Sequence, residues 1–403
     1  MRTLLAESFR AAVAAADPLR ILPPHLPRPP RGRTFVAAAG KAAASMALAV
    51  ERHWPRDAPL AGIAITRYGH GLPTRRVRVV EAGHPVPDAA GESAAREMLA
   101  AVRALGPDDL LLALVSGGGS SLLSLPAEGV PMDGLKAMTR ELLRCGAPIQ
   151  EINTARKHLS AIQGGRLAAA CRAPVLALIV SDVTGDDPTH IASGPCAPDP
   201  STVDDAQAVL RKYGIAAPGP FSETPKPGEA LFARVENRVI ATARLSLEAA
   251  AAVFAARGIA PINLGDAITG EASEVAKAMA AQAREARRPS VLVSGGECTV
   301  TVRATGGRGG RCAEFLLALA IALEGVPGVH GIAADTDGID GSEENAGALL
   351  APDTLARAAA HGIDAQKMLA ANDSYGFFSA LGDLVVTGPT RTNVNDYRAI
   401  LLA

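Results

Sequence analysis

Four short apolar runs are spaced along the chain, and each of them stops abruptly on glycine, serine or aspartate. The runs begin at residues 110, 175, 291 and 329 and lead into VSGGGSSL, VSD, VSGGE and AADTDGIDG. A continuous apolar run of four to eight residues is typical of a strand that is buried on both faces. Strands with polar residues at their carboxyl ends are typical of an open parallel sheet, where ligands bind beyond the strand ends. The pattern therefore predicts an α/β fold with its chemistry at the carboxyl edge of a largely parallel sheet.

Hydrophobic periodicity also predicts the elements around these runs. Further strands are expected over residues 34–39, 62–66, 77–81 and 238–242. Helices are expected over residues 4–16, 91–105, 152–168, 246–257 and 271–287, and from residue 313 onward. Residues 217–229 read APGPFSETPKPGE, a Pro- and Gly-rich stretch that is typical of a linker between modules. The chain is therefore expected to divide into domains of residues 1–230 and 231–403.

Length and composition narrow the class of protein. A chain of 403 residues is longer than one hydrophobic core usually serves, which supports two domains. A formal net charge of −1 does not indicate the excess of positive charge that is typical of proteins that bind nucleic acid or an anionic membrane. Five scattered cysteines without CxxC spacing argue against a disulfide framework or a zinc site, and they suit a reducing cytoplasm. We expect a cytoplasmic enzyme that acts on small molecules and is a monomer or a homodimer.

The amino-terminal segment is expected to be an ordinary amphipathic helix. Its apolar part carries Glu7 and Arg10, which argues against both a signal peptide and a membrane span. No run in the sequence approaches the roughly 18 uncharged apolar residues that a membrane span requires.

The glycine-rich turn after residue 115 is the strongest candidate for ligand binding. Consecutive glycines let the backbone approach a ligand closely, and their N–H groups and the neighbouring hydroxyls suit phosphate oxygens. The turn is not a Walker A motif, and the alternative is a flexible turn without a ligand. The candidate nucleotide- or substrate-binding residues of this turn are Ser116, Gly117, Gly118, Gly119, Ser120 and Ser121.

Two basic residues stand where helices are expected to begin. Lys41 follows the strand over residues 34–39, and Arg311 follows the glycine-rich segment GGRGG. Helix N-termini favour anions, so each side chain is a candidate ligand for phosphate or carboxylate. The alternative for Lys41 is a solvated surface lysine.

Aspartates cluster after two of the predicted strands. Asp182 and Asp186 follow the run at residue 175, and carboxylates in such a loop match the way that enzymes hold Mg²⁺ with one or two carboxylates. Asx-turn chemistry is the alternative interpretation of aspartates in a tight loop. Asp335 and Asp337 form a second candidate pair, although their spacing does not fit an EF-hand.

Eight motifs occur in an order that resembles one known family. They are GK at Lys41, GHPVPD, VSGGGSSLL, INTARKHLS with IQGGRLA, SDVTGDDPTHIASGP, GGRGGR, AADTDGIDG and TNVNDY. The chain resembles the class II glycerate kinases, the glycerate 2-kinase family whose C-terminal part is called the MOFRL domain. The likeness covers nearly the whole chain.

The resemblance implies a fold and an activity. It implies a Rossmann-like N-terminal domain, a C-terminal α/β MOFRL domain, and an active site in the cleft between them. It implies phosphorylation of D-glycerate to 2-phosphoglycerate with ATP and Mg²⁺. The family's catalytic lysine and arginine fall on Lys41 and Arg311. The shared motifs also place Arg156, His158, Asn393 and Asn395 among the expected nucleotide- or substrate-binding residues.

Some alternatives remain open from the sequence. The chain has Cys312, Ala313 and Arg391 where relatives resemble GGRNQE and TGTNVND, so substrate fit is less secure than the reaction type. Which of Lys41 and Arg311 would hold the carboxylate of a three-carbon acid is undecided. Family members have carried the name hydroxypyruvate reductase, but we find no GxGxxG after a strand for a dinucleotide. A non-catalytic metabolite-binding protein is the third alternative.

Overall fold

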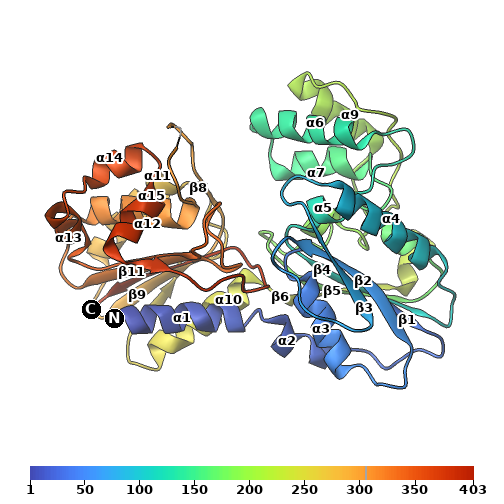
Figure 1. The fold of residues 1–403 in the computed structure, drawn as a ribbon, viewed down its shortest axis with the longest axis horizontal. Coiled ribbons are helices and arrows are strands. Elements are labelled where there is room, and N and C mark those ends of the chain that lie inside the picture. Colours follow the sequence, from blue (N-terminus) through green and yellow to red (C-terminus); the bar gives the residue numbers. More distant parts are fainter. Residues whose placement is uncertain (305) are drawn as a thin grey trace. The chain divides into compact units, whose positions relative to one another are not determined.

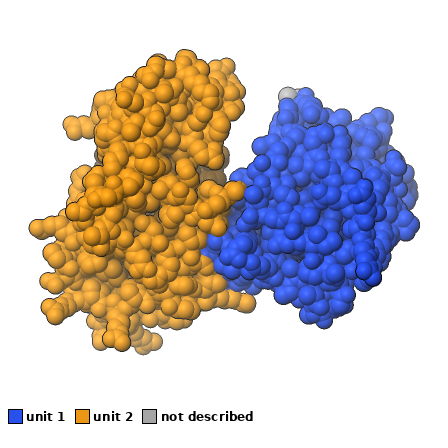
Figure 2. Space-filling view, turned by 180° about the vertical axis from the view of Figure 1, so that it is seen from behind, with its two compact units in different colours: residues 1–17, 241–403 blue, residues 18–240 orange. Residues whose placement is uncertain are grey.

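The computed structural model of the chain describes residues 1–304 and 306–403, and these residues form two compact units (Figures 1 and 2). Unit 1 combines residues 1–17 with residues 241–403, and unit 2 contains residues 18–240. This division differs from the predicted boundary after residue 230 in two places. Residues 231–240 belong to unit 2 because β6 (Val235–Ala241) joins its sheet. Residues 1–17 belong to unit 1 because α1 (Arg2–Ala14) packs into its core.

Unit 2 is built on a six-stranded sheet with the order β3-β2-β1-β4-β5-β6. The strands other than β6 are β1 (Thr34–Ala39), β2 (Leu60–Arg67), β3 (Val77–Ala82), β4 (Leu110–Ser116) and β5 (Val175–Val180). These five strands pair in parallel, as the sequence predicted. The chain order reverses between β1 and β4, and such a reversal opens a crevice beyond the carboxyl ends of the two strands.

Helices cover both faces of this sheet. α4 (Ala89–Arg103) shares one core cluster with alternate residues of β1, whose side chains point to a single face. α3 (Ala43–His53) also contacts β1, β2 and β4, yet it has no residue in that cluster, so it lies on the other face. A group of helices with its own small core, formed by α6 (Met132–Arg144), α7 (Ile149–Lys157) and α9 (Val203–Tyr213), lies apart from the sheet (Figure 1). The short helices of unit 2 are α2 (Pro18–Ile21), α5 (Gly119–Leu122), α8 (Arg166–Ala169), η1 (Pro23–His25), η2 (Ile191–Ser193) and η3 (Ala230–Arg234).

The single helix predicted over residues 152–168 is broken in the structure. α7 ends at Lys157, and the chain resumes helical geometry only at Arg166 in α8. Gly164 and Gly165 have φ of +60° and +79°, a left-handed geometry that cannot continue a right-handed helix. The break brings Gln163 to the glycine-rich turn, where its Nε2 donates to the Ser120 carbonyl oxygen at 2.8 Å.

Unit 1 is built on a six-stranded mixed sheet with the order β13-β12-β11-β14-β9-β7. Its strands are β7 (Ala260–Asn263), β9 (Ser290–Ser294), β11 (Val329–Asp335), β12 (Gly347–Leu350), β13 (Leu384–Val385) and β14 (Asp396–Leu402). β14 is antiparallel to both β9 and β11 and lies between them. This sheet is therefore mixed, whereas the largely parallel sheet of the prediction is that of unit 2. β9 and β11 nevertheless run in the same direction and end at the same edge.

Unit 1 also has helices on both faces of its sheet. α1 and α10 (Ala243–Ala255) cover one face, where Phe9 stacks on Tyr397 of β14. α11 (Ala272–Glu285) and α12 (Arg311–Leu323) cover the other face. The smaller elements are α13 (Thr354–Ala360), α14 (Ala365–Ala370), α15 (Ser374–Leu381) and the two-stranded pair of β8 (Gly270–Glu271) with β10 (Cys298–Thr299). None of the described helices is long and apolar enough to cross a membrane.

Candidate functional site

The glycine-rich turn lies at the point in unit 2 where the strand order reverses. β4 ends at Ser116 beside β1, and the three glycines lead directly into α5. Gly118 has φ of +79°, a left-handed geometry that favours glycine. The Ser116 Oγ accepts a hydrogen bond of 3.1 Å from the Ala42 N–H, which fixes the turn against the segment after β1. The structure thus has a tight glycine-rich turn directly after a strand, where the sequence predicted one.

Lys41 lies against this turn. Its N–H donates to the Gly117 carbonyl oxygen at 2.8 Å. A β-carbon added at Gly118 would lie 3.3 Å from the Lys41 Cγ and 2.9 Å from the His84 Nε2. Lys41, His84 and Gly118 are therefore neighbours, and a side chain larger than hydrogen at position 118 would disturb both partners. The surroundings of Lys41 are those of a side chain beside a backbone turn rather than those of an isolated surface lysine.

The first candidate metal ligands follow the neighbouring strand. β5 pairs with β4 in parallel, and Ser116 lies opposite Val180, so Asp182 emerges at the same edge as the glycine-rich turn. Asp182 and Asp186 are both partly buried, and Asp186 has φ of +53°. Asp187 makes an Asx-type bond, since its Oδ1 accepts from the Thr189 N–H at 2.9 Å. Turn chemistry thus accounts for the aspartate that follows Asp186.

A row of polar side chains joins the glycine-rich turn to α7. The hydroxyls of Ser120 and Ser193 lie 2.9 Å apart, and the Ser193 Oγ donates to the Asn153 Oδ1 at 3.3 Å. The same Asn153 oxygen accepts from the Arg156 Nη1 at 3.4 Å. The sequence predicted Ser120 and Arg156 as ligands but missed Ser193 and Asn153.

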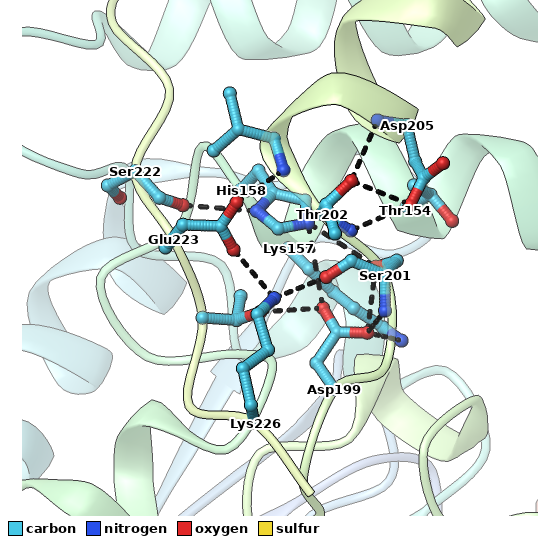
Figure 3. A network of polar contacts seen from close by, with 12 residues as sticks. Thr154, Lys157, His158, Asp199, Ser201, Thr202, Asp205, Ser222, Glu223 and Lys226 are labelled. Atoms are coloured by element: carbon cyan, nitrogen blue, oxygen red, sulfur yellow. Dashed lines mark hydrogen bonds and ion pairs between the residues drawn. The ribbon is translucent and has the colours of Figure 1, made fainter.

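His158 belongs to a different, buried network (Figure 3). Its ring nitrogens contact the Ser222 carbonyl oxygen at 3.1 Å and the Ser201 Oγ at 3.3 Å. Both nitrogens are therefore engaged in a side chain with no exposed surface. Burial lowers the pKa of His158 despite the nearby carboxylate of Asp199. The predicted role of His158 in ligand binding is not supported by this placement.

The network around Asp199 also corrects the predicted linker. The Lys157 Nζ and the Thr224 Oγ1 bond the two carboxylate oxygens of Asp199 at 3.3 and 3.1 Å. Ser222, which contacts His158 (Figure 3), lies within residues 217–229. Thr224 lies in the same segment, and the two contacts hold that segment on unit 2. The segment is fixed by buried charges rather than flexible, which places the boundary between the units after residue 240.

Arg311 is the centre of a charged cluster in unit 1. Its Nε, Nη1 and Nη2 donate to Asp396, Glu297 and Asp335 at 2.7, 2.7 and 2.8 Å. The strand directions account for the convergence, because β9 and β11 end at the edge where β14 begins, and Asp335 pairs with Asp396 in the ladder. Buried Arg398 donates to the second carboxylate oxygen of Asp396 at 2.6 Å.

The charges of this cluster fix the protonation of Arg311. Burial alone would lower its pKa, but the carboxylates of Asp396, Asp335 and Glu297 raise it well above the ordinary value. Arg311 therefore stays cationic at any pH at which the protein is folded. Among its three carboxylate partners only the side chain of Glu297 is largely exposed, at 54% against 5% for Asp335 and 0% for Asp396.

The remaining predicted residues of unit 1 surround this cluster. The Asp335 Oδ1 accepts from the Asp337 N–H, and the Asp337 Oδ1 accepts from the Ile339 N–H. Asn393 and Asn395 are buried in the segment that enters β14, where the Asn395 carbonyl oxygen accepts from the Thr336 hydroxyl at 2.7 Å. The structure thus brings Arg311, Asp335, Asp337, Asn393 and Asn395 into one unit, whereas Lys41, the glycine-rich turn, Arg156, Asp182 and Asp186 belong to the other.

Asp340 holds the start of α12, a role that sequence reasoning missed. Its two carboxylate oxygens accept from the Cys312 and Ala313 N–H groups at 2.9 and 2.8 Å. A carboxylate at a helix N-terminus satisfies N–H groups that have no partner within the helix. Asp340 therefore fixes the first turn of α12, which carries Arg311. Cys312 and Ala313, where the sequence differs from the family pattern, supply the two backbone N–H groups that bond this aspartate.

Three other residues of these two sites were missed at the sequence level. Glu297 and Asp396 were visible only as members of strand-end motifs, and Arg398 lies inside an apolar strand. From the sequence, His84 in the proline-rich loop of residues 82–88 is either a ligand or an ordinary loop histidine, and the structure places it beside Gly118. Within the described residues, no three histidine, cysteine, aspartate or glutamate side chains come together as a metal cage.

Comparisons with known proteins extend over both units. Residues 4–223 match the domain of unknown function DUF4147, and residues 290–396 match the MOFRL family. The chain is 38% identical over 410 residues to D-glycerate 2-kinase of Thermotoga maritima, which covers 98% of this chain and 97% of that protein. It is 52% identical over 417 residues to an Agrobacterium vitis protein with a provisional hydroxypyruvate reductase name, with coverage of 100% and 94%. The crystal structure of glycerate kinase (EC 2.7.1.31) from Thermotoga maritima matches with a TM-score of 0.88 and 38% identity, covering 100% of this chain and 99% of that one.

Proposed function

The chain belongs to the class II glycerate kinase family, and on that premise we propose that it phosphorylates D-glycerate to 2-phosphoglycerate with ATP. The observation that carries the proposal is the glycine-rich turn at the strand reversal of unit 2, with Lys41 packed against it. Open α/β sheets bind ligands at such reversals. Phosphoryl transfer needs alignment and charge neutralisation more than covalent chemistry, and backbone N–H groups beside a lysine suit that need.

Each candidate residue is proposed for the role that suits its chemistry. The N–H groups of the glycine-rich turn and the hydroxyls of Ser120 and Ser121 would hold phosphate oxygens. Lys41 would face the phosphoryl group in transit and neutralise the charge that develops on it. Arg311 is the second catalytic cation of the proposal, and its exposed contact with Glu297 is the one that an incoming anion would replace most easily.

Magnesium is part of the proposal, and the chemistry of Asp182 and Asp186 fits it. Mg²⁺ usually takes one or two protein carboxylates and leaves its other positions to water and phosphate, so no full protein cage is needed. Asp182 lies at the sheet edge that carries the glycine-rich turn. Asp335 and Asp337 fit less well, because Asp335 already bonds Arg311. A bound Mg²⁺ would neutralise phosphate charge, and Asp182→Asn should then raise the Mg²⁺ concentration required for half-maximal turnover.

One pair of assays tests the reaction. With D-glycerate and ATP, the protein should release ADP and form a product that enolase dehydrates directly, which distinguishes 2-phosphoglycerate from 3-phosphoglycerate. With hydroxypyruvate and NADH or NADPH, no oxidation of the dinucleotide should appear. Dinucleotide oxidation without ADP release would replace the kinase by the reductase whose name two relatives from Agrobacterium vitis carry.

A further inference from the structure

Among the described residues, Arg156 is a cation without an acidic partner, in a partly buried position of unit 2. It stands in the last turn of α7, and the one hydrogen bond of its guanidinium to a described residue is the 3.4 Å contact with the Asn153 Oδ1. No aspartate or glutamate within residues 1–304 and 306–403 forms an ion pair with it. The next residue, Lys157, is just as close to the helix end but pairs with Asp199. Desolvation lowers the pKa of Arg156 to about 10.

A desolvated cation without a counter-ion costs free energy in the absence of a ligand. Removing a guanidinium from water is unfavourable unless an opposite charge or several hydrogen bonds compensate for it. Where such a group persists beside a binding turn, an anionic ligand is the natural source of the missing charge. The cost is then recovered on binding.

The surroundings of Arg156 connect it to the glycine-rich turn. Asn153 and Ser193 link its guanidinium to the Ser120 hydroxyl through contacts of 3.4, 3.3 and 2.9 Å. Ala192, Ser193 and Gly194 have φ of +51°, +58° and +57°, so two residues other than glycine adopt a left-handed backbone at this point. Strained backbone of this kind collects at ligand-binding sites.

Arg311, the other candidate for an anion clamp, is in a different electrostatic state. Three of its N–H groups already donate to carboxylates, so a substrate carboxylate would meet negative charge there. The Arg156 guanidinium donates to no carboxylate of the described residues, so a substrate carboxylate would not compete with one there.

We propose that Arg156, with the hydroxyl of Ser193, receives the carboxylate of the acceptor acid and so selects a hydroxy acid over a neutral polyol. The inference rests on the proposed kinase function. A guanidinium offers a planar fork that matches a carboxylate, and a phosphate oxygen of the nucleotide is the competing anion of the same chemistry.

The test compares Arg156→Met with Arg140→Met, which removes an exposed arginine of α6. In Arg156→Met the affinity for D-glycerate, measured by calorimetry, should fall by at least about 30-fold, since a buried charged contact is lost. ATP affinity should stay within about twofold. The preference for D-glycerate over glycerol as acceptor should collapse by a similar factor. Arg140→Met should match the wild type in all three measurements.

Thermal stability separates binding from a structural role. If Arg156 is held for a ligand, Arg156→Met should melt at the wild-type temperature or above it in the absence of ligand. A lowered melting temperature, or unchanged D-glycerate affinity in the folded variant, would overturn the proposal. Weakened ATP binding with normal D-glycerate binding would assign Arg156 to phosphate and overturn it as well. Failure of the kinase function itself would appear separately, as a wild-type protein that releases no ADP with D-glycerate.

Discussion

The environment of Lys41 is that of a lysine held against a backbone turn rather than that of a solvated surface lysine, a distinction that its sequence position does not make. A lysine at a strand-to-helix turn is compatible with both roles. In the structure its stem packs beside Gly118 and its N–H bonds the glycine-rich turn, so its position is tied to the candidate phosphate site.

Replacing Lys41 with methionine should slow the chemical step without abolishing nucleotide binding. We expect kcat to fall by roughly 10² to 10³, about 3 to 4 kcal/mol, the scale of losing one preorganised electrostatic contact. ATP affinity should stay near normal, because the glycine-rich turn is intact. Lys41→Arg should not restore kcat, since a planar guanidinium does not fit the space of a compact ammonium.

The control for this variant is Lys367→Met, which removes a lysine whose side chain is 85% exposed. Its activity should equal that of the wild type, and its stability should change by no more than about 0.5 kcal/mol. Wild-type kcat in Lys41→Met would remove Lys41 from the mechanism and leave Arg311 as the catalytic cation.

Single residues were predictable where local pattern decides their role, and unpredictable where distant contacts do. The positive φ of Gly118 and the turn position of Lys41 follow from the residues around them. The engagement of Arg311 with Asp396 depends on a strand pairing between residues far apart in sequence. His158 could not be judged from its neighbours either, because its partners Ser201 and Ser222 come from distant segments.

At the scale of elements, buried parallel strands were the most predictable feature. β1 matches the predicted residues 34–39 because a short, uninterrupted apolar run bounded by polar residues favours a buried strand strongly. β14 was missed because Arg398 interrupts its apolar run. Its hydrogen bonds with Asp396, Gly295 and Cys298 make that arginine acceptable in a core. The directions of the strands in unit 1 depend on long-range pairing, which local periodicity does not encode.

The turn between β4 and α5 allows a test with a matched control. Gly118→Ala should cost about 1 to 2 kcal/mol of stability, because a left-handed φ of +79° is unfavourable for alanine. It should also lower kcat/KM by up to roughly 10²-fold, since the new β-carbon displaces His84 and Lys41. Thermal melts and steady-state kinetics measure the two effects.

Gly146→Ala is the control, because Gly146 has φ of +71° and no atom within 4 Å of an added β-carbon. It should lose a similar amount of stability and keep its activity. Equal loss of activity in the two variants would show that backbone strain alone, rather than contact with the site, is responsible.

At the scale of the whole molecule, the amino-terminal helix belongs to the unit that ends the chain. Leu5, Phe9 and Ala12 of α1 are buried against α10 and the sheet of unit 1, and the Tyr397 hydroxyl bonds Ser8 at 2.8 Å. Amphipathic periodicity predicted the helix but not its partner. A boundary drawn along the sequence assigns this helix to the first domain, although its apolar face packs on the second.

Phe9→Ala should therefore weaken unit 1 selectively. Removing a fully buried phenylalanine costs about 3 to 5 kcal/mol. Hydrogen exchange should show faster exchange in β11 and β14 and unchanged exchange in β1 and β4. The control is Arg10→Ala, which removes the exposed side chain next to Phe9 and should leave both sheets protected from exchange. If Phe9→Ala lost protection equally in the sheets of unit 1 and unit 2, the assignment of α1 to unit 1 would be contradicted.

The discontinuous composition of unit 1 sets an order on folding during synthesis. α1 leaves the ribosome before unit 2, but the strands that α1 covers emerge only after all of unit 2 has been translated. Until then its apolar face lacks its native partner, and unit 2 has every one of its residues available to fold. A nascent chain arrested near residue 280 should thus carry a protease-resistant unit 2 and a protease-sensitive amino-terminal tail. The tail should become resistant only when β14 has left the exit tunnel, so a strand that is made after unit 2 completes the burial of a helix that is made before it.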